Sequence, residues 1–196
     1  MLDLILLRHA QSTGNKAGLF QGQADMDPIE AEFPDALLRQ ITAIGEVSAL
    51  YTTDLKRGRI PAESLRYKLE ILYEKSILYE STPLLRERNL GELEGKPYTM
   101  ISTDFDKVVH HTYMTETIQG GESRQQLQER TAQVRELYIA DKQGVIIMIS
   151  HGVFLKYLLD NLENTQGVKW ILENLKGYHA ILNNNTLLQL QQFPTK

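Results

Sequence analysis

The sequence predicts an α/β fold with a largely parallel sheet and helices on both of its faces. Two short runs, at residues 2–7 and 145–149, are almost entirely apolar, which is typical of strands buried on both sides. Segments with helical spacing of apolar residues lie between the strand-like runs. Strands that alternate with helices in this way are usually joined by crossovers, so parallel pairing is favoured.

The chain carries several strand candidates, and the run at 145–149 is the clearest of them. It reads Val-Ile-Ile-Met-Ile and follows Gly144, while the run at 2–7 is ended by the charge of Arg8. Shorter candidates, which complete the predicted sheet, lie at 48–53, 76–79 and 187–190, with one more around 178–182.

The clearest helix is predicted over residues 122–142. Ser123 and Gln126 have the spacing of a capping box, in which the hydroxyl accepts from the Gln126 amide and the glutamine reaches back. Side chains that suit a buried stripe then recur at helical spacing, at Leu127, Thr131, Val134 and Tyr138. A further helix, marked by Leu155, Leu158 and Leu159, is predicted directly after the strand at 145–149.

Two other segments are predicted as helices that proline or glycine restricts. Residues 55–72 have a helical pattern, but a proline in a helix interior costs about 3 kcal/mol. Pro61 therefore predicts that the regular helix begins close to Ile60. The segment 25–46 contains a proline and a glycine, which predict a short or broken helix there.

Composition narrows the class of protein. The chain has 196 residues, 42% of them hydrophobic and 23% charged, which predicts one soluble domain over 1–196. It has no cysteine, so disulfides, thiolate metal sites and cysteine nucleophiles are excluded. The net charge is −4 and no basic stripe is present, so we expect no nucleic-acid partner. The apolar run at the N-terminus is too short for a signal peptide or a membrane span, so we expect a cytoplasmic protein.

Candidate reactive side chains follow two of the predicted strands. In parallel sheets ligands bind beyond the carboxyl ends of the strands. The run at 2–7 leads into Arg8 and His9, and the run at 145–149 leads into His151. Both histidines leave the sheet on the same side, so they face one pocket if the two strands are neighbours. His151 also lies close to a helix N-terminus, where free amides favour anions.

These residue types suit phosphoryl transfer. A neutral imidazole can attack phosphorus without a metal or a thiol, and nearby arginines hold its pKa down. The arginine guanidinium also matches the oxygens of a phosphate. Arg8 and Arg57 are the candidates, since Arg57 follows the strand at 48–53. Glu87, on a loop after the third strand, is a candidate acid for the leaving oxygen.

The motifs around these residues resemble those of the histidine phosphatase superfamily, or phosphoglycerate mutase-like family. The resemblance covers nearly the whole chain and keeps the family's motif order. Its segments are Leu7-Arg8-His9-Ala10 with Ser12, Thr13 and Asn15; Phe20-Gln21-Gly22; Tyr51 to Arg57; Leu85-Arg86-Glu87 with Gly91 to Gly95; Gly120 to Ser123; Ser150-His151-Gly152; and Asn183 to Leu188. Departures are Ala10, Gly58 and Pro61, where the family commonly has glycine, alanine and threonine.

The resemblance implies both a fold and a set of roles. The implied fold is a three-layer α/β/α sandwich with one antiparallel edge strand. His9 would carry the phosphoryl group, and Glu87 would donate a proton to the leaving group and later activate water. Arg8, Arg57 and His151 would hold the phosphate oxygens. The remaining residues implied to bind phosphate or substrate are Thr13, Asn15, Gln21, Gly22 and Gly152.

Non-catalytic interpretations also exist for Glu87 and for a pair of adjacent histidines. Glu87 stands between Arg86 and Arg88, so a surface ion-pair cluster is the alternative. His110 and His111 are adjacent, point in different directions on a helix and have no second ligand pair, so a polar face is favoured over a metal site.

The expected function is hydrolysis of small-molecule phosphomonoesters through a phosphohistidine on His9, with no metal or cofactor. Phosphoglycerate mutase activity is the first alternative, but the segment from about 98 to 119 is short, whereas the mutases tend to have a longer one. A catalytically silent phosphate-binding protein and a metallohydrolase are the others. We expect a small-molecule phosphomonoester as the partner and no membrane partner, and a homodimer stays open.

Overall fold

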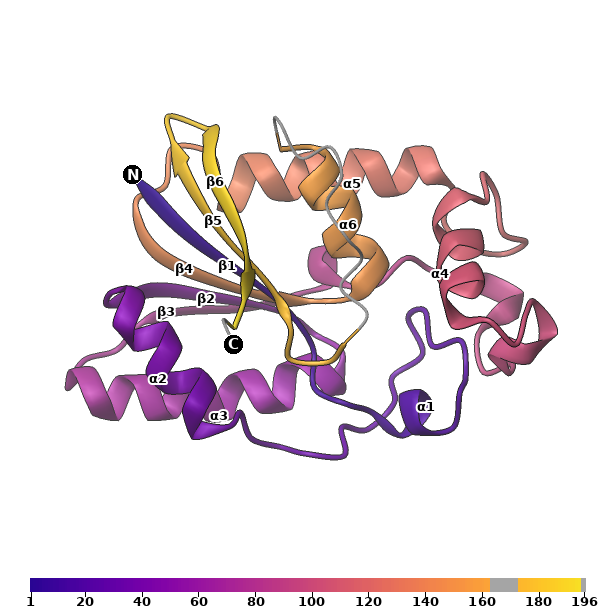
Figure 1. Ribbon diagram of the computed structural model, residues 1–196, viewed down its shortest axis with the longest axis horizontal. Coiled ribbons are helices and arrows are strands. Elements are labelled where there is room, and N and C mark those ends of the chain that lie inside the picture. The colour runs from indigo at the N-terminus through magenta and orange to yellow at the C-terminus, as the bar shows by residue number, and fades with distance from the viewer. Residues whose placement is uncertain (163–172, 195–196) are drawn as a thin grey trace.

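A six-stranded sheet forms the centre of the computed structural model, which describes residues 1–162 and 173–194 (Figure 1). Its strands lie in the order β3-β2-β4-β1-β5-β6. Their bounds are β1 Leu2–Arg8, β2 Val47–Thr53, β3 Leu78–Thr82, β4 Gly144–Ser150, β5 Gly177–Asn183 and β6 Thr186–Phe193.

Strand directions confirm the predicted fold class. The strands β1, β2, β3 and β4 pair in parallel, while β5 is antiparallel to β1. The antiparallel strand is followed by β6, which pairs antiparallel with β5 and forms the edge. The almost continuous apolar runs in the sequence are β1 and β4, whose inner residues are buried on both faces of the sheet.

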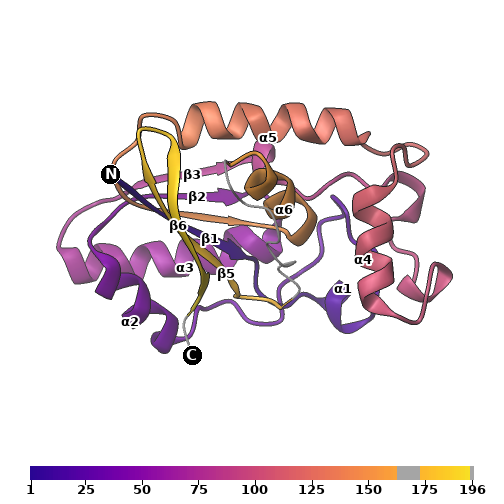
Figure 2. The same cartoon turned by 45° about the horizontal axis from the view of Figure 1, so that its top comes forward.

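Helices cover both faces of the sheet, which makes the three layers (Figure 2). One core lies under α5 (Arg124–Tyr138) and α6 (Gly152–Asp160) and includes Leu4 and Leu6 of β1. The other lies under α2 (Asp35–Ile44) and α3 (Lys56–Tyr73) and includes Ile5 and Leu7. Alternate residues of one strand therefore serve opposite cores, as the pleat requires.

The structure corrects several predicted boundaries. The helix α3 begins at Lys56 rather than near Ile60, because the amides of Gly58 and Arg59 bond the Leu55 carbonyl upstream of Pro61. The proline removes one amide donor of a helix whose first turn is already closed. The third strand runs over β3 rather than 76–79. The helix predicted over 122–142 is confirmed as α5 with its capping box at Ser123, but it ends at Tyr138.

Short segments stand beyond the carboxyl ends of the parallel strands. Figure 1 shows α1 and α4 together at the end of the molecule farthest from the β5–β6 turn. Four residues, Phe20, Leu90, Val108 and Ile118, make a small separate core there. These segments are α1 Thr13–Lys16, η1 Pro83–Leu85, η2 Gly91–Leu93, η3 Tyr98–Met100 and α4 Phe105–Met114. None of the helices in the described ranges is long and apolar enough to cross a membrane.

Candidate active site

The two histidines predicted to share a pocket do lie together. β1 and β4 are neighbours with Arg8 opposite Ser150, and the His9 amide donates to the Ser150 carbonyl over 2.9 Å. The ring centroids of His9 and His151 are 4.8 Å apart. Both rings line a cleft with about 600 Å³ of empty volume, at the carboxyl edge of the sheet.

His9 is held in one orientation and kept neutral. Its Nδ1 lies 2.6 Å from the Ala10 carbonyl oxygen. Because a carbonyl oxygen can only accept, Nδ1 carries the hydrogen and Nε2 keeps a lone pair. Burial, followed by the charges of Arg57 and Arg8, lowers the pKa of His9 well below 6.5. The ring therefore presents a neutral nitrogen nucleophile at neutral pH.

His151 caps the N-terminus of α6 with its backbone and turns its ring into the cleft. Only 1% of the residue is exposed, and neither ring nitrogen has a hydrogen-bond partner within the described part of the chain. Burial, followed by the charge of Arg57, lowers the pKa of His151 well below 6.5. A buried imidazole without a partner suits a bound group that can accept its N–H.

Arg57 lies in the first turn of α3, with 1% of its surface exposed. Its two Nη atoms each donate over 2.7 Å, to the carbonyls of Gly22 and Ala24. Burial lowers its pKa to about 10, so it stays charged at neutral pH. With Arg8, the last residue of β1, it gives the cleft a second buried guanidinium.

Gly58 explains one departure from the family pattern. A Cβ at this position would lie 2.3 Å from Cγ2 of Thr53 and 3.8 Å from Cβ of His9. The first turn of α3 therefore packs too closely against the end of β2 for an alanine to fit without a shift. This close packing brings Arg57 up to the histidine pair.

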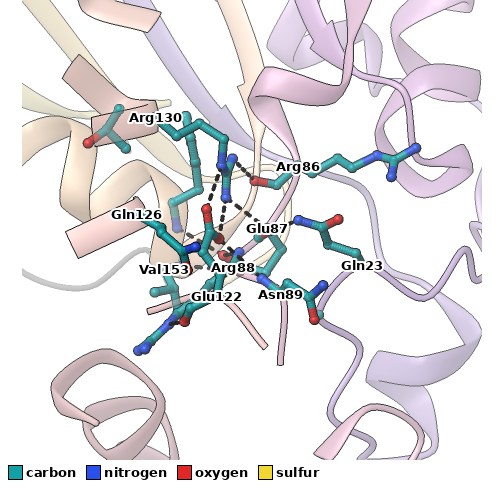
Figure 3. A network of polar contacts seen from close by, with 12 residues as sticks. Gln23, Arg86, Glu87, Arg88, Asn89, Glu122, Gln126, Arg130 and Val153 are labelled. Atoms are coloured by element: carbon teal, nitrogen blue, oxygen red, sulfur yellow. Dashed lines mark hydrogen bonds and ion pairs between the residues drawn. The ribbon is translucent and has the colours of Figure 1, made fainter. Parts of the chain in front are cut away.

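Glu87 lies in the cleft and bonds the N-terminus of α6 (Figure 3). Its Oε1 accepts from the amides of Arg88 and Phe154, each at 2.9 Å, and its Oε2 accepts from the Val153 amide at 3.1 Å. Oε2 takes a single amide, so it retains a lone pair that can hold a proton. Neither adjacent arginine pairs with this carboxylate, since Arg86 bonds Asp54 and Arg88 bonds backbone carbonyls. The ion-pair interpretation of this segment is therefore wrong for Glu87.

A buried network behind Glu87, absent from the sequence prediction, holds the acid loop. Arg130 of α5 makes a two-pronged bond to Glu122 at 2.8 and 2.7 Å. It also donates to the carbonyls of Leu84, Arg86 and Glu87, at 2.9, 2.7 and 3.3 Å (Figure 3). The sequence signal for this pair was Glu122 just before the helix cap and Arg130 two turns later.

Gln21, Gly22 and Gly152 line the cleft, in the places where the prediction put them. Gln21 accepts a hydrogen bond of 2.6 Å from the Ser12 hydroxyl. Gly22 has φ +49°, and a Cβ there would lie 2.1 Å from Oε1 of Glu94. Both the backbone conformation and this contact require glycine at Gly22.

Thr13 and Asn15, which the prediction placed among the residues that bind phosphate or substrate, are not among the residues that line the cleft. Thr13 is exposed at the start of α1. Ser12, one position earlier, is the buried hydroxyl, and it shares a capping box with Asn15. Tyr98 also lines the cleft, together with Arg8.

His110 and His111 are both exposed on α4, in keeping with the predicted polar face. Within residues 1–162 and 173–194 no group of three or more histidine, aspartate or glutamate side chains is placed to hold a metal ion.

The histidine pair makes stability depend on pH. Folded His9 and His151 stay neutral well below pH 6.5, whereas the unfolded chain takes up a proton at each near 6.5. Below pH 6.5 the unfolded state therefore binds more protons than the folded state. The contribution of the two histidines to the free energy of unfolding is complete above pH 6.5 and decreases as the pH falls below that value. The expected loss is up to about 1.4 kcal/mol per pH unit for each histidine. Urea unfolding at several pH values measures it, and His151→Gln should reduce the slope; an unchanged slope contradicts this account.

Comparison with known proteins matches residues 4–181 to the family described as the histidine phosphatase superfamily (branch 1). The chain belongs to this superfamily. This confirms the family resemblance drawn from the motifs in the sequence.

Curated relatives carry both phosphatase and mutase names. A metal-independent phosphoserine phosphatase of Arabidopsis thaliana is 28% identical over 79% of this chain, and the match spans 66% of that protein, just under two thirds. Probable phosphatase C1687.21 of Schizosaccharomyces pombe is 28% identical over 94% of this chain and 84% of its own length. The probable phosphoglycerate mutase GpmB of Escherichia coli is 27% identical, over 83% of this chain and 75% of its own.

Solved structures support the fold. Bacillus stearothermophilus YhfR aligns with a TM-score of 0.68 and 21% identity, over 95% of this chain and 94% of that one. A phosphoglycerate mutase from Thermus thermophilus aligns with a TM-score of 0.62 and 20% identity, over 96% and 97%.

Proposed function

We propose that the chain is a metal-independent phosphatase that hydrolyses small-molecule phosphomonoesters through a phosphohistidine on His9. The observation that carries this proposal is the state of His9. Its Nδ1 is committed to the Ala10 carbonyl, and burial with two arginines holds the ring neutral. Nε2 is then an available nucleophile among Arg8, Arg57 and His151, which can bind the phosphoryl oxygens.

In the first step Nε2 of His9 attacks phosphorus and the bond to the leaving oxygen breaks. The two guanidiniums and His151 stabilise the charge on the equatorial oxygens. The proton that the leaving oxygen needs comes from Glu87, through Oε2. The products of this step are a phosphohistidine, the free alcohol and a Glu87 carboxylate.

In the second step a water molecule attacks the phosphorus of the phosphohistidine. The Glu87 carboxylate takes a proton from that water, and the nitrogen–phosphorus bond breaks. The site is thereby restored, and inorganic phosphate leaves with its oxygens still matched to the arginines.

Phosphoglycerate mutase activity is the second candidate, because relatives such as GpmB are named probable phosphoglycerate mutases. A mutase has to shield the phosphohistidine from water and return the phosphoryl group to a glycerate. The compact segment over the cleft, in which α4 has 10 residues, favours hydrolysis instead.

Trapping the intermediate tests the proposal. With p-nitrophenyl phosphate in excess chelator, we expect steady phosphate release, and rapid quenching should give a protein heavier by one phosphoryl group. This phosphoryl label should be lost in acid and kept in base, because the nitrogen–phosphorus bond of a phosphohistidine is labile in acid and stable in base. The label should map to His9. Hydrolysis that chelator abolishes, or a label on another residue, overturns the mechanism. A label that persists in water and is discharged only by glycerates indicates a mutase.

A further inference from the structure

The cleft has two chemically different ends. Its base holds the histidine pair with Arg8 and Arg57, whereas its far wall is mostly apolar and has half of its side chains from α4. The lining side chains of that wall are Phe20, Leu90, Val108, Val109, Thr112 and Val153. The base suits a phosphate, so the far wall is what the rest of the substrate meets.

We propose that this enzyme selects phosphomonoesters whose leaving group is apolar and carries no acidic group, such as aryl and longer alkyl phosphates. The inference rests on the proposed phosphatase function and names its substrate class. It places phosphoglycerates among the poor substrates, although a mutase name occurs among the relatives.

Charge carries the first part of the argument. Among the described residues that line the cleft, the arginine side chains are Arg8 and Arg57, and both belong to the phosphate end. The one lining carboxylate is Glu87. A carboxylate on the leaving group would therefore lose its hydration against valines without gaining a cation. An apolar leaving group gives up no favourable hydration against this wall, and burying its surface there is favourable.

The polar atoms of the wall are already committed, which is the second part of the argument. The Thr112 hydroxyl lies 2.9 Å from the Val109 carbonyl and 3.2 Å from that of Val108, so its hydrogen bonds inside α4. The outward side of the same helix carries the exposed His110 and His111. α4 is therefore amphipathic, with its apolar side toward the cleft.

The wall is also fixed in place. Arg88, which is fully buried, donates to the carbonyls of Thr112 and Thr115 at the end of α4, over 2.6 and 2.7 Å. The Tyr113 hydroxyl bonds Asp160 of α6, and the Tyr157 hydroxyl donates to the Tyr113 carbonyl over 3.0 Å. A helix held at several points keeps its valines at a set distance from the phosphate end, which is what selection by a wall requires.

Matched substrates separate charge from apolarity. Glycerol 3-phosphate and 3-phosphoglycerate differ mainly in the carboxylate, and hexyl phosphate supplies an apolar leaving group that is also a primary alcohol. We expect kcat/KM for glycerol 3-phosphate to exceed that for 3-phosphoglycerate by roughly tenfold or more, and the value for hexyl phosphate to exceed both. Equal values, or a preference for 3-phosphoglycerate, would overturn the inference.

A pair of neighbouring variants tests the wall itself. Val109→Lys puts a cation on the cleft side of α4, and we expect it to shift the ratio toward 3-phosphoglycerate by roughly tenfold. His110→Lys adds the same group on the outward side and should leave the ratio unchanged. An active Val109→Lys enzyme with an unchanged ratio would also overturn the inference. If that variant does not fold, the wild-type ratios decide alone. Failure of the proposed function looks different, because no phosphomonoester would then be hydrolysed by folded wild-type protein.

Discussion

Replacing His9 with asparagine is expected to lower kcat/KM for p-nitrophenyl phosphate by at least roughly 10⁴-fold, to the level of catalysis without a nucleophile. Asparagine keeps an N–H that can donate to the Ala10 carbonyl, so the 2.6 Å contact of His9 has a substitute. The variant should therefore fold and still bind inorganic phosphate through Arg8 and Arg57. Steady-state kinetics measures the activity, the phosphoryl label reports the phosphohistidine, and a thermal melt reports whether the variant is folded.

The neighbouring histidine gives the matched comparison. His151→Asn removes a donor to the phosphoryl oxygens but leaves the nucleophile, so we expect a smaller loss, on the order of 10²–10³-fold, with the label still on His9. His110→Asn changes an exposed side chain and should have no effect. The assignment fails if the His9 variant still turns over through a label on another residue, or if both buried histidines prove equally dispensable.

The sequence predicts the base of the site well, because each base residue ends a strand or lies within a few residues after one, and the apolar pattern reveals these strands. The neighbouring strands β1 and β4 end at the same level of the sheet. The pairing of these two strands is therefore the only long-range contact that has to be known to place Arg8, His9 and His151 together. Parallel topology then fixes the edge at which they emerge. Arg57 follows β2 in the same way, and Glu87 lies beyond β3.

The errors arise where a local rule decides less than the surrounding packing. A proline weakens a helix without forbidding one, so α3 begins before Pro61 once its first turn is bonded to Leu55. Ser12 and Thr13 are adjacent hydroxyls, and only the geometry of the cap decides that Ser12 is buried. A shift of one residue in a tight turn therefore moves a side chain from the interior to solvent.

Apart from the pair of Arg130 and Glu122, the supporting shell could not be predicted, because its other partners are backbone carbonyls. Arg88 and Arg130 bind the carbonyls of two loops and of the end of α4, and a carbonyl has no sequence signature. Such arginines look like surface charges until the chain is folded. Arg130 bonds the loop that carries Glu87, and Arg88 bonds the end of α4, so the positions of Glu87 and of α4 depend on these two arginines.

Arg130→Met is expected to cost about 3–5 kcal/mol in the free energy of unfolding. The side chains of Arg130 and Glu122 are only 13% and 12% exposed, and methionine fills the place of the aliphatic stem without the guanidinium. The Glu122 carboxylate then has no cation, and the carbonyls of Leu84 and Arg86 lose their donor. Urea unfolding measures the loss, and adding Glu122→Gln should recover part of it by removing the buried charge. Arg39→Met, on the exposed surface of α2, is the control and should be neutral.

Activity should change in a way that stability alone does not produce. Arg130 holds the backbone of Glu87, so its loss displaces the proton donor more than the nucleophile. An alkyl phosphate needs a proton on its leaving oxygen, and we expect its turnover to fall by about 10²–10⁴-fold, as in a Glu87→Gln variant. p-Nitrophenyl phosphate has a far better leaving group, so its loss should be much smaller at a temperature where both proteins are folded. Equal losses for the two substrates would mean that Arg130 supports the fold as a whole, and that the link from α5 to the acid loop is not specific to proton donation.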